Sequence, residues 1–270
     1  MTFLQGFILF IAAILGGALN SVAGGGSFIT FPSLILTGVL PIQANATSTV
    51  ALWPGSLASV GAYRKELAGQ NRVRLLVLVG TSLIGGVLGA ILLLRTSQST
   101  FVKLIPYLLL VATLLFAFSG PITSHLRKRA GNAASMLDTA KSEQLLQKRP
   151  DSPLRLVVLS LIQLVIATYG GYFGGGIGIL MLASLGLMGM ENVHEMNALK
   201  TVLQSSINGV AVITFIVAGA VVWFQAIVMI LGAIMGGFFG AYFARQLDQR
   251  IVRGFVILVG VSMTIYFFLK

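Results

Sequence analysis

Apolar runs separated by short polar stretches cover most of the chain. The first half holds five runs, at about residues 3–21, 27–40, 42–63, 73–94 and 102–119. The second half holds five more, at about 154–168, 177–190, 194–217, 221–244 and 251–269. Most approach or exceed the ~20 residues with which an α-helix crosses a hydrocarbon core of ~30 Å. The runs at 27–40 and 177–190 are too short for that, so the pattern predicts an all-α polytopic membrane protein that includes two half-helices.

The chain repeats this pattern at an offset close to 150 residues. Three motifs of the first half return in the second: Gly24–Gly26 as Gly174–Gly176, Asn45–Val50 as Asn197–Val202, and Gly85–Ala90 as Gly236–Ala241. Duplicated membrane units with glycine breaks at corresponding places are typical of transporters that bind their substrate at the repeat interface. We predict two membrane repeats, residues 1–119 and 154–270, joined by a polar linker at 120–153. Each repeat would hold about four full helices and one half-helix after its triple-glycine break.

Lys and Arg are unevenly distributed along the chain. Four lie at 64–74, seven at 127–155 and three at 245–253, which with Lys200 make 15 of the 18 basic residues. Cytoplasmic segments carry the excess of Lys and Arg in membrane proteins. The segments at 64–74 and 245–253 share the cytoplasmic side only if the second repeat is inverted relative to the first. The charge pattern predicts inverted repeats, a cytoplasmic linker, and both termini outside the cytoplasm.

Two alternatives stay open at this point. A parallel duplication would place 245–253 outside, since the positive-inside rule is a statistical bias. The runs at 3–21 and 27–40 either both cross the membrane or form a re-entrant hairpin. The inverted relation holds whether these two runs cross the membrane or form a hairpin, because each arrangement leaves the next helix on the same side.

Composition agrees with a membrane location, since 56% of the residues are hydrophobic and 9% are charged. The net charge of +11 favours contact with the anionic headgroups of the lipid bilayer. Nucleic-acid binding is not expected, because no recognition fold or aromatic platform accompanies the charge. We expect no cofactor and no metal site, because the chain lacks cysteine and its apolar runs lack paired carboxylates. Backbone carbonyls could still hold a sodium ion.

The glycine runs are the first candidate for substrate chemistry. Gly24, Gly25, Gly26 with Ser27, and Gly174, Gly175, Gly176, each precede a short run, where free N–H donors and the helix dipole would form an anion cradle. The alternative is close helix packing, which we favour for the small-xxx-small motifs at 85–90 and 236–241.

Polar side chains form a stripe on one face of the run at 194–217. The stripe consists of residues that recur at helical spacing, namely Asn197, Thr201, Gln204, Ser205 and Asn208. A shorter stripe at duplicated positions consists of Asn45, Ser48, Thr49 and Ser56. We predict that both stripes line one substrate site with the glycine breaks. The alternative is that the amides and hydroxyls only join helices.

Three ionisable residues stand at the start of this second stripe or on it. Lys200 is a candidate anion ligand, although its ammonium could instead snorkel outward or pair with Glu191 or Glu195. His194 and Glu195 are the candidates for proton coupling, and an uninvolved loop histidine is the alternative. We expect no enzyme, because His194-Glu195 begins an H-E-x-x-H motif that Ala198 does not complete.

Three segments together resemble the sulfite exporter TauE/SafE family of membrane permeases: Gly24 to Pro32, Gln43 to Ser48 and His194 to Lys200. The resemblance covers nearly the whole chain except the linker. It implies a secondary transporter, generally an exporter, of small sulfur-containing anions such as sulfite, thiosulfate or organic sulfonates across the inner membrane. An anion channel or uniporter and a non-transporting membrane assembly factor are the alternatives. The anion, the coupling ion and the oligomeric state stay open.

Overall fold

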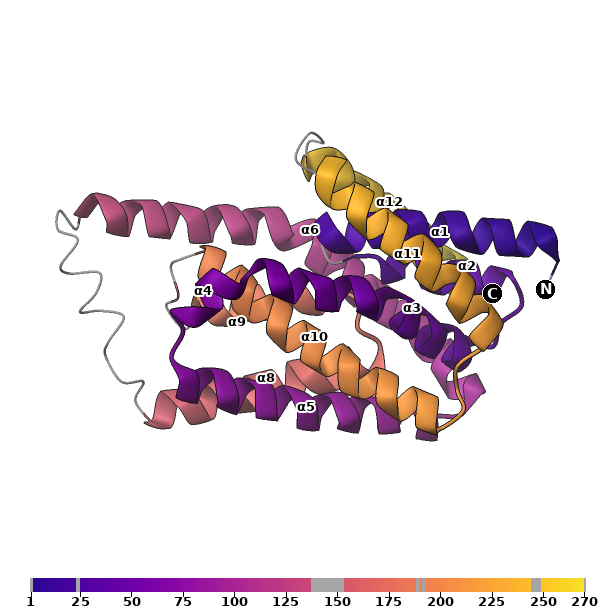
Figure 1. Cartoon of the computed structure of the whole chain (residues 1–270), viewed down its shortest axis with the longest axis horizontal. Coiled ribbons are helices and arrows are strands. Elements are labelled where there is room, and N and C mark those ends of the chain that lie inside the picture. The colour runs from indigo at the N-terminus through magenta and orange to yellow at the C-terminus, as the bar shows by residue number, and fades with distance from the viewer. Residues whose placement is uncertain are drawn as a thin grey trace.

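The computed structural model describes residues 2–22, 25–136, 153–187, 190, 193–243 and 249–269, and its regular structure there is entirely helical (Figure 1). The helices of the first half are α1 Phe3–Val22, α2 Ser27–Leu36, α3 Pro41–Ala62, α4 Arg64–Ala68, α5 Arg72–Arg95 and α6 Gln98–Met136. Those of the second half are α8 Pro153–Tyr172, α9 Ile177–Leu187, α10 Val193–Val217, α11 Trp223–Phe243 and α12 Gln249–Leu269. The all-α prediction is confirmed, and both runs after the triple glycines form short helices.

Two features differ from the predicted elements. Helix α4, which has five residues, was not predicted and follows a backbone turn at Tyr63. Helix α6 has 39 residues and continues past 119 to Met136, so the predicted start of the linker is not a helix end. At ~1.5 Å per residue α6 is about 58 Å long, which is longer than a bilayer core is thick. The remaining linker, 137–152, lies outside the described residues.

Local chemistry sets several helix boundaries. Asn71 caps α5, because its side-chain oxygen accepts hydrogen bonds from the amides of Val73 and Arg74 at 2.9 and 3.3 Å. Helix α3 begins with Pro41, and the Gln98 side chain accepts a hydrogen bond from the Ile42 amide at 3.3 Å. The start of α3 is therefore held by the first residue of α6.

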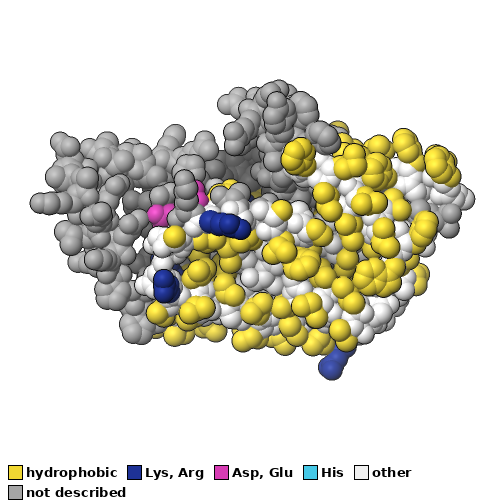
Figure 2. Space-filling view, in the orientation of Figure 1, with side chains coloured by type: hydrophobic (Ala, Val, Ile, Leu, Met, Phe, Trp, Pro, Cys, Tyr) yellow, Lys and Arg dark blue, Asp and Glu magenta, His cyan; other side chains and the backbone are white. Residues whose placement is uncertain are grey.

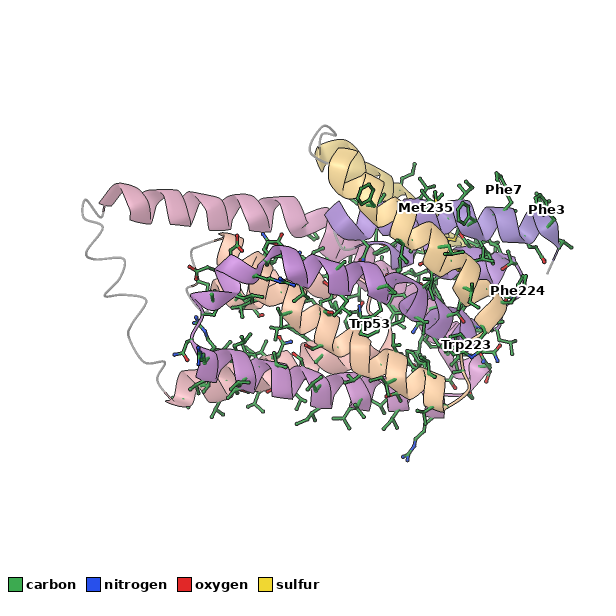
Figure 3. All side chains as sticks on the ribbon, in the orientation of Figure 1. Phe3, Phe7, Trp53, Trp223, Phe224 and Met235 are labelled. Atoms are coloured by element: carbon green, nitrogen blue, oxygen red, sulfur yellow. The ribbon has the colours of Figure 1, made fainter. Side chains whose placement is uncertain are left out.

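Four helices of the described chain are long and apolar enough to cross a membrane, namely α1, α5, α6 and α10. Helix α3 has 22 residues but falls below this hydropathy because of its polar stripe. Apolar side chains are spread over the described face in Figure 2, with few charged side chains among them. Phe3 and Phe7, which are 93% and 56% exposed, project from α1 in Figure 3, as side chains that face lipid do. The protein is therefore a multi-pass helical membrane protein.

The contacts between the two halves come in equivalent pairs. Helices α1, α3, α5 and α6 of the first half correspond to α8, α10, α11 and α12 of the second. Helix α1 packs on α11 while α5 packs on α8, and α3 packs on α11 while α10 packs on α5. Two pairs of equivalent helices also meet, α3 with α10 and α6 with α12. In Figure 1 each full helix of the first half runs opposite to its counterpart. Both chain ends lie at one end of the molecule, whereas α4, the end of α6 and the start of α8 lie at the other. This arrangement is what an inverted duplication would produce, and the inverted relation itself stays a prediction.

Glycines allow the closest of these approaches. Gly89 of α5 lies against the backbone of Thr168, Gly171 and Tyr172 on α8, and Gly236 of α11 lies against the backbone of Ile14 on α1. A side chain at either glycine would meet backbone atoms. These two motifs therefore pack helices, as expected.

Candidate functional site

The second glycine break joins α8 to α9 through an irregular but hydrogen-bonded backbone. Gly174 and Gly176 have φ angles of +80° and +77°, a region that other residues rarely adopt. The Tyr169 hydroxyl donates a hydrogen bond to the Gly175 carbonyl at 2.8 Å, and the Gly174 amide donates to the Tyr169 carbonyl at 3.3 Å. Tyr169 therefore holds the break in one conformation.

Asn45 connects the first polar stripe to this second break. Its side-chain nitrogen donates to the Tyr172 carbonyl at 3.1 Å, and the side chain is only 3% exposed. Tyr172 is the last residue of α8, where helix carbonyls lose their partners inside the helix. The stripe of one half thus satisfies the backbone at the break of the other, and the amide of Asn45 is already used.

The first break is closed by hydroxyl groups, and Gly24 lies outside the described residues. The Thr30 hydroxyl donates to the Gly26 carbonyl at 3.1 Å, and it is 2.6 Å from the Ser48 hydroxyl. Ser48 is 1% exposed and Gly25 is buried, whereas Ser27, the first residue of α2, is half-buried. In this structure Ser48 is therefore a buried partner of Thr30.

Lys200 and Gln204 of α10 lie side by side against α9, the second short helix. A Cβ placed on Gly178, the second residue of α9, would be 3.3 Å from both the Lys200 Cδ and the Gln204 Oε1. Both side chains are half-buried. In the described part of the chain, which includes Glu195 but not Glu191, no hydrogen bond or ion pair holds the Lys200 ammonium. These two groups, unlike Asn45 and Ser48, remain available to a ligand.

The two threonines of the stripes bond within their own helices. Thr49 donates to the Asn45 carbonyl at 2.9 Å, and Thr201 donates to the Asn197 carbonyl at 2.8 Å. Asn197 is half-buried and has a polar interaction of its own. The equivalent threonines behave alike in both halves.

Glu195 belongs to a polar chain at the start of α10. It accepts a hydrogen bond from the Gln70 side chain at 2.9 Å, and Gln70 accepts one from Arg74 at 3.2 Å. Gln70 is 7% exposed. The side chain of His194 lies outside the described part of the structure. Among the described residues no cluster of three His, Cys, Asp or Glu could hold a metal ion.

Sequence reasoning missed the aromatic residues at the centre. The Trp53 indole nitrogen donates to the Ser205 carbonyl at 3.1 Å, and its ring lies against Gly209, between α3 and α10 (Figure 3). Tyr169 and Tyr172 were missed too, because neither lies in a repeated motif. Trp53 had a signal, since it continues the spacing of four residues from Asn45 through Thr49.

A bundle of apolar helices in which two short helices follow glycine breaks, beside helices with polar stripes, is typical of multi-pass membrane transporters. Within that class, the family model for the sulfite exporter TauE/SafE matches residues 9–267. The chain belongs to the sulfite exporter TauE/SafE family.

Curated relatives agree with this class. A protein of Haemophilus influenzae named "Probable membrane transporter protein" is 26% identical over 95% of this chain and 92% of its own length. "Probable membrane transporter protein ORF9" of a Sinorhizobium species is 27% identical over 95% of this chain and 90% of its own. "Probable membrane transporter protein YfcA" of Escherichia coli K12 is 24% identical over 95% and 87% of the two chains. No solved structure matches the chain.

Proposed function

We propose that the protein is a secondary transporter that exports small sulfur oxyanions or organosulfonates and binds the anion between its two repeats. The observation that carries the proposal is the placement of Lys200 and Gln204 over the first turn of α9. The ammonium supplies charge, the Gln204 amide supplies a donor, and the start of α9 supplies the positive end of a helix dipole. A sulfur oxyanion has the charge and the acceptor oxygens to satisfy all three.

The proposed site is asymmetric although the halves are similar. In the first half the positions equivalent to Gly178 and Lys200 hold Phe28 and Ser48, which are 2% and 1% exposed. Glycine at 178 leaves room for the lysine stem, whereas the equivalent position holds a buried phenylalanine. We therefore assign anion binding to the second break, where Lys200 and Gln204 would be joined by Asn197 and Thr201.

The remaining predicted ligands receive supporting roles in this proposal. Asn45 fixes the second break through the Tyr172 carbonyl, and Thr49 stabilises the α3 turn that carries Asn45. Ser48 and Thr30 close the first break, at Gly25 and Gly26. A change of conformation that separates Ser48 from Thr30 would open this break to the anion.

Two features of the cellular arrangement belong to the same proposal. We place the protein in the inner membrane, with the linker and the α4 end of the molecule in the cytoplasm. That end holds α4, the end of α6 and the start of α8, and the basic residues at 64–74 favour the cytoplasmic side. Both termini, at the opposite end, then lie outside the cytoplasm. Glu195, with His194 beside it in sequence, is the proposed proton-coupling group, since its carboxylate already accepts a hydrogen bond from Gln70 of the other half.

The test is anion flux into proteoliposomes that contain the purified protein. Sulfite, thiosulfate, short-chain sulfonates and carboxylates are supplied singly, and saturation of the initial rate is measured. We expect saturable flux of the sulfur anions and a rise in KM of at least tenfold for Lys200→Met. Lys103→Met is the control, because Lys103 is exposed on α6 and should leave KM unchanged.

Other outcomes would count against the proposal. Flux that does not saturate would favour a channel, and a wild-type protein that moves no anion would favour an assembly factor. If Lys200→Met transports every tested anion with the wild-type KM, the lysine is not an anion ligand.

A further inference from the structure

Trp53 and Ser205 occupy equivalent positions of the two halves. They are 152 residues apart, the same offset that separates Asn45 from Asn197. They also touch, since the Trp53 indole nitrogen donates to the Ser205 carbonyl at 3.1 Å. Equivalent residues of two related repeats can meet only close to the axis that relates them. Each is also near the middle of its helix, so the contact lies at the centre of the bundle.

The Ser205 hydroxyl is unusual among the hydroxyls of the described helices. Its neighbours follow the common pattern, in which Thr201 and Ser206 donate to the carbonyl four residues earlier at 2.8 and 2.9 Å. Ser205 is 5% exposed, yet its Oγ has no hydrogen-bond partner. A buried hydroxyl without a partner costs free energy, and a ligand that accepts its hydrogen bond removes that cost.

The surroundings of Ser205 continue the proposed anion site. Ser205 lies about 6 Å beyond Thr201 along α10, at ~1.5 Å per residue, and the spacing of four residues places both on the same face of the helix. Trp53 lies beside Ser205 and is held in place, because its N–H is bonded to the Ser205 carbonyl and its ring lies against Gly209. A Cβ on Gly209 would be 3.2 Å from the Trp53 Cζ2, so the ring has little room on that side.

We propose that Ser205 and Trp53 form a second contact point for the transported anion, at the centre of the membrane, and that Trp53 limits the size of its organic substituent. The Ser205 hydroxyl donates to an anion oxygen that has passed Lys200 and Gln204, while the indole ring packs against the substituent. Sulfite and sulfonates with short chains fit this description, and sulfonates with bulky groups are excluded. This inference rests on the proposed function.

Three variants test the inference in the proteoliposome assay. Ser205→Ala should raise the KM for sulfite and methanesulfonate about five- to tenfold, because it deletes the donor. Trp53→Leu should admit benzenesulfonate, which the wild type should reject. Ser206→Ala is the matched control: its hydroxyl is satisfied by the Val202 carbonyl, so its KM should equal that of the wild type.

A fourth variant measures contact with the anion directly. The natural chain has no cysteine, so Ser205→Cys carries a single thiol. Sulfite reacts with disulfides and with thiosulfonate reagents, so methanesulfonate is the protecting anion here. We expect a small methanethiosulfonate reagent to label the thiol and methanesulfonate to slow the labelling at least threefold.

The outcomes separate this inference from the proposed function. If the wild type transports no anion, the proposed function fails. If the wild type transports but Ser205→Ala and Trp53→Leu keep its KM and size limit, only the inference is wrong. A thiol at 205 that does not react, or reacts equally fast with and without methanesulfonate, also overturns it.

Discussion

Replacing Gly89 with alanine would test how closely the two halves depend on each other at α5 and α8. A Cβ at this position would lie 2.7 Å from the Tyr172 amide nitrogen and 2.9 Å from the Gly171 carbonyl carbon, and it would also meet the Thr168 carbonyl oxygen. All of these are backbone atoms, so no side-chain rotation relieves the contact. The two helices have to move apart, and the displaced segment leads directly into the second glycine break.

The expected destabilisation follows from two opposing contributions. Overpacking a tightly packed contact costs ~1–3 kcal/mol. Alanine in place of glycine inside a helix returns up to ~1 kcal/mol. We therefore expect Gly89→Ala to lower the free energy of unfolding by about 1–2 kcal/mol, which corresponds to roughly 5–30-fold in the equilibrium constant.

The matched control is Gly80→Ala on the same helix, because no atom lies within 4 Å of its Cβ position. Both variants are unfolded reversibly in mixed detergent micelles, and their anion flux is measured in proteoliposomes. Gly80→Ala should be as stable as the wild type or up to ~1 kcal/mol more stable. Equal stability of the two variants would refute the argument, because helix propensity would then outweigh the packing contact.

Three further predictions concern hydrogen bonds between the halves. Gln163 donates a hydrogen bond to Ser82 at 2.8 Å, and both side chains are at least 96% buried. A double-mutant cycle of Gln163→Leu and Ser82→Ala should therefore give a coupling free energy of ~0.6–1.7 kcal/mol in unfolding, and additive effects would contradict this. Asn45→Leu should cost ~1–3 kcal/mol, measured by unfolding, and should also reduce flux, because the Tyr172 carbonyl loses its donor. Gln70→Leu should reduce flux, because Glu195 loses the hydrogen bond that Gln70 donates to its carboxylate. If the pH profile of transport is unchanged in this variant, Glu195 is not the proton-coupling group.

Much of the architecture could be read from the order of residues. Apolar runs become helices in a bilayer because every backbone group must bond inside its own segment, and length then separates full spans from half-helices. The short runs at 27–40 and 177–190 accordingly form α2 and α9. The end of α6 was missed because Gly120 to Met136 has no strong helix stop, so the change to polar residues was taken for the end of the helix.

The site was only partly predictable. The repeated motifs singled out Asn45 and Ser48 as candidate ligands, and the structure pairs them with Tyr172 and Thr30 on other helices. Spacing along one helix shows which side chains share a face, and it does not show whether that face meets a carbonyl, a hydroxyl or open space. Trp53 could have been included by its spacing, whereas Tyr169 had no sequence signal.

The sequence by itself determined the membrane class, the duplication and the family, because these depend on composition, period and motif along one chain. Tertiary structure alone decided which helices of the two halves pack together and that Asn45 is already bonded to the Tyr172 carbonyl. It also decided that Lys200 and Gln204 both lie against Gly178. The reason is physical: these facts depend on which faces of distant helices come into contact, and that is set by the packing of glycine surfaces across the two halves.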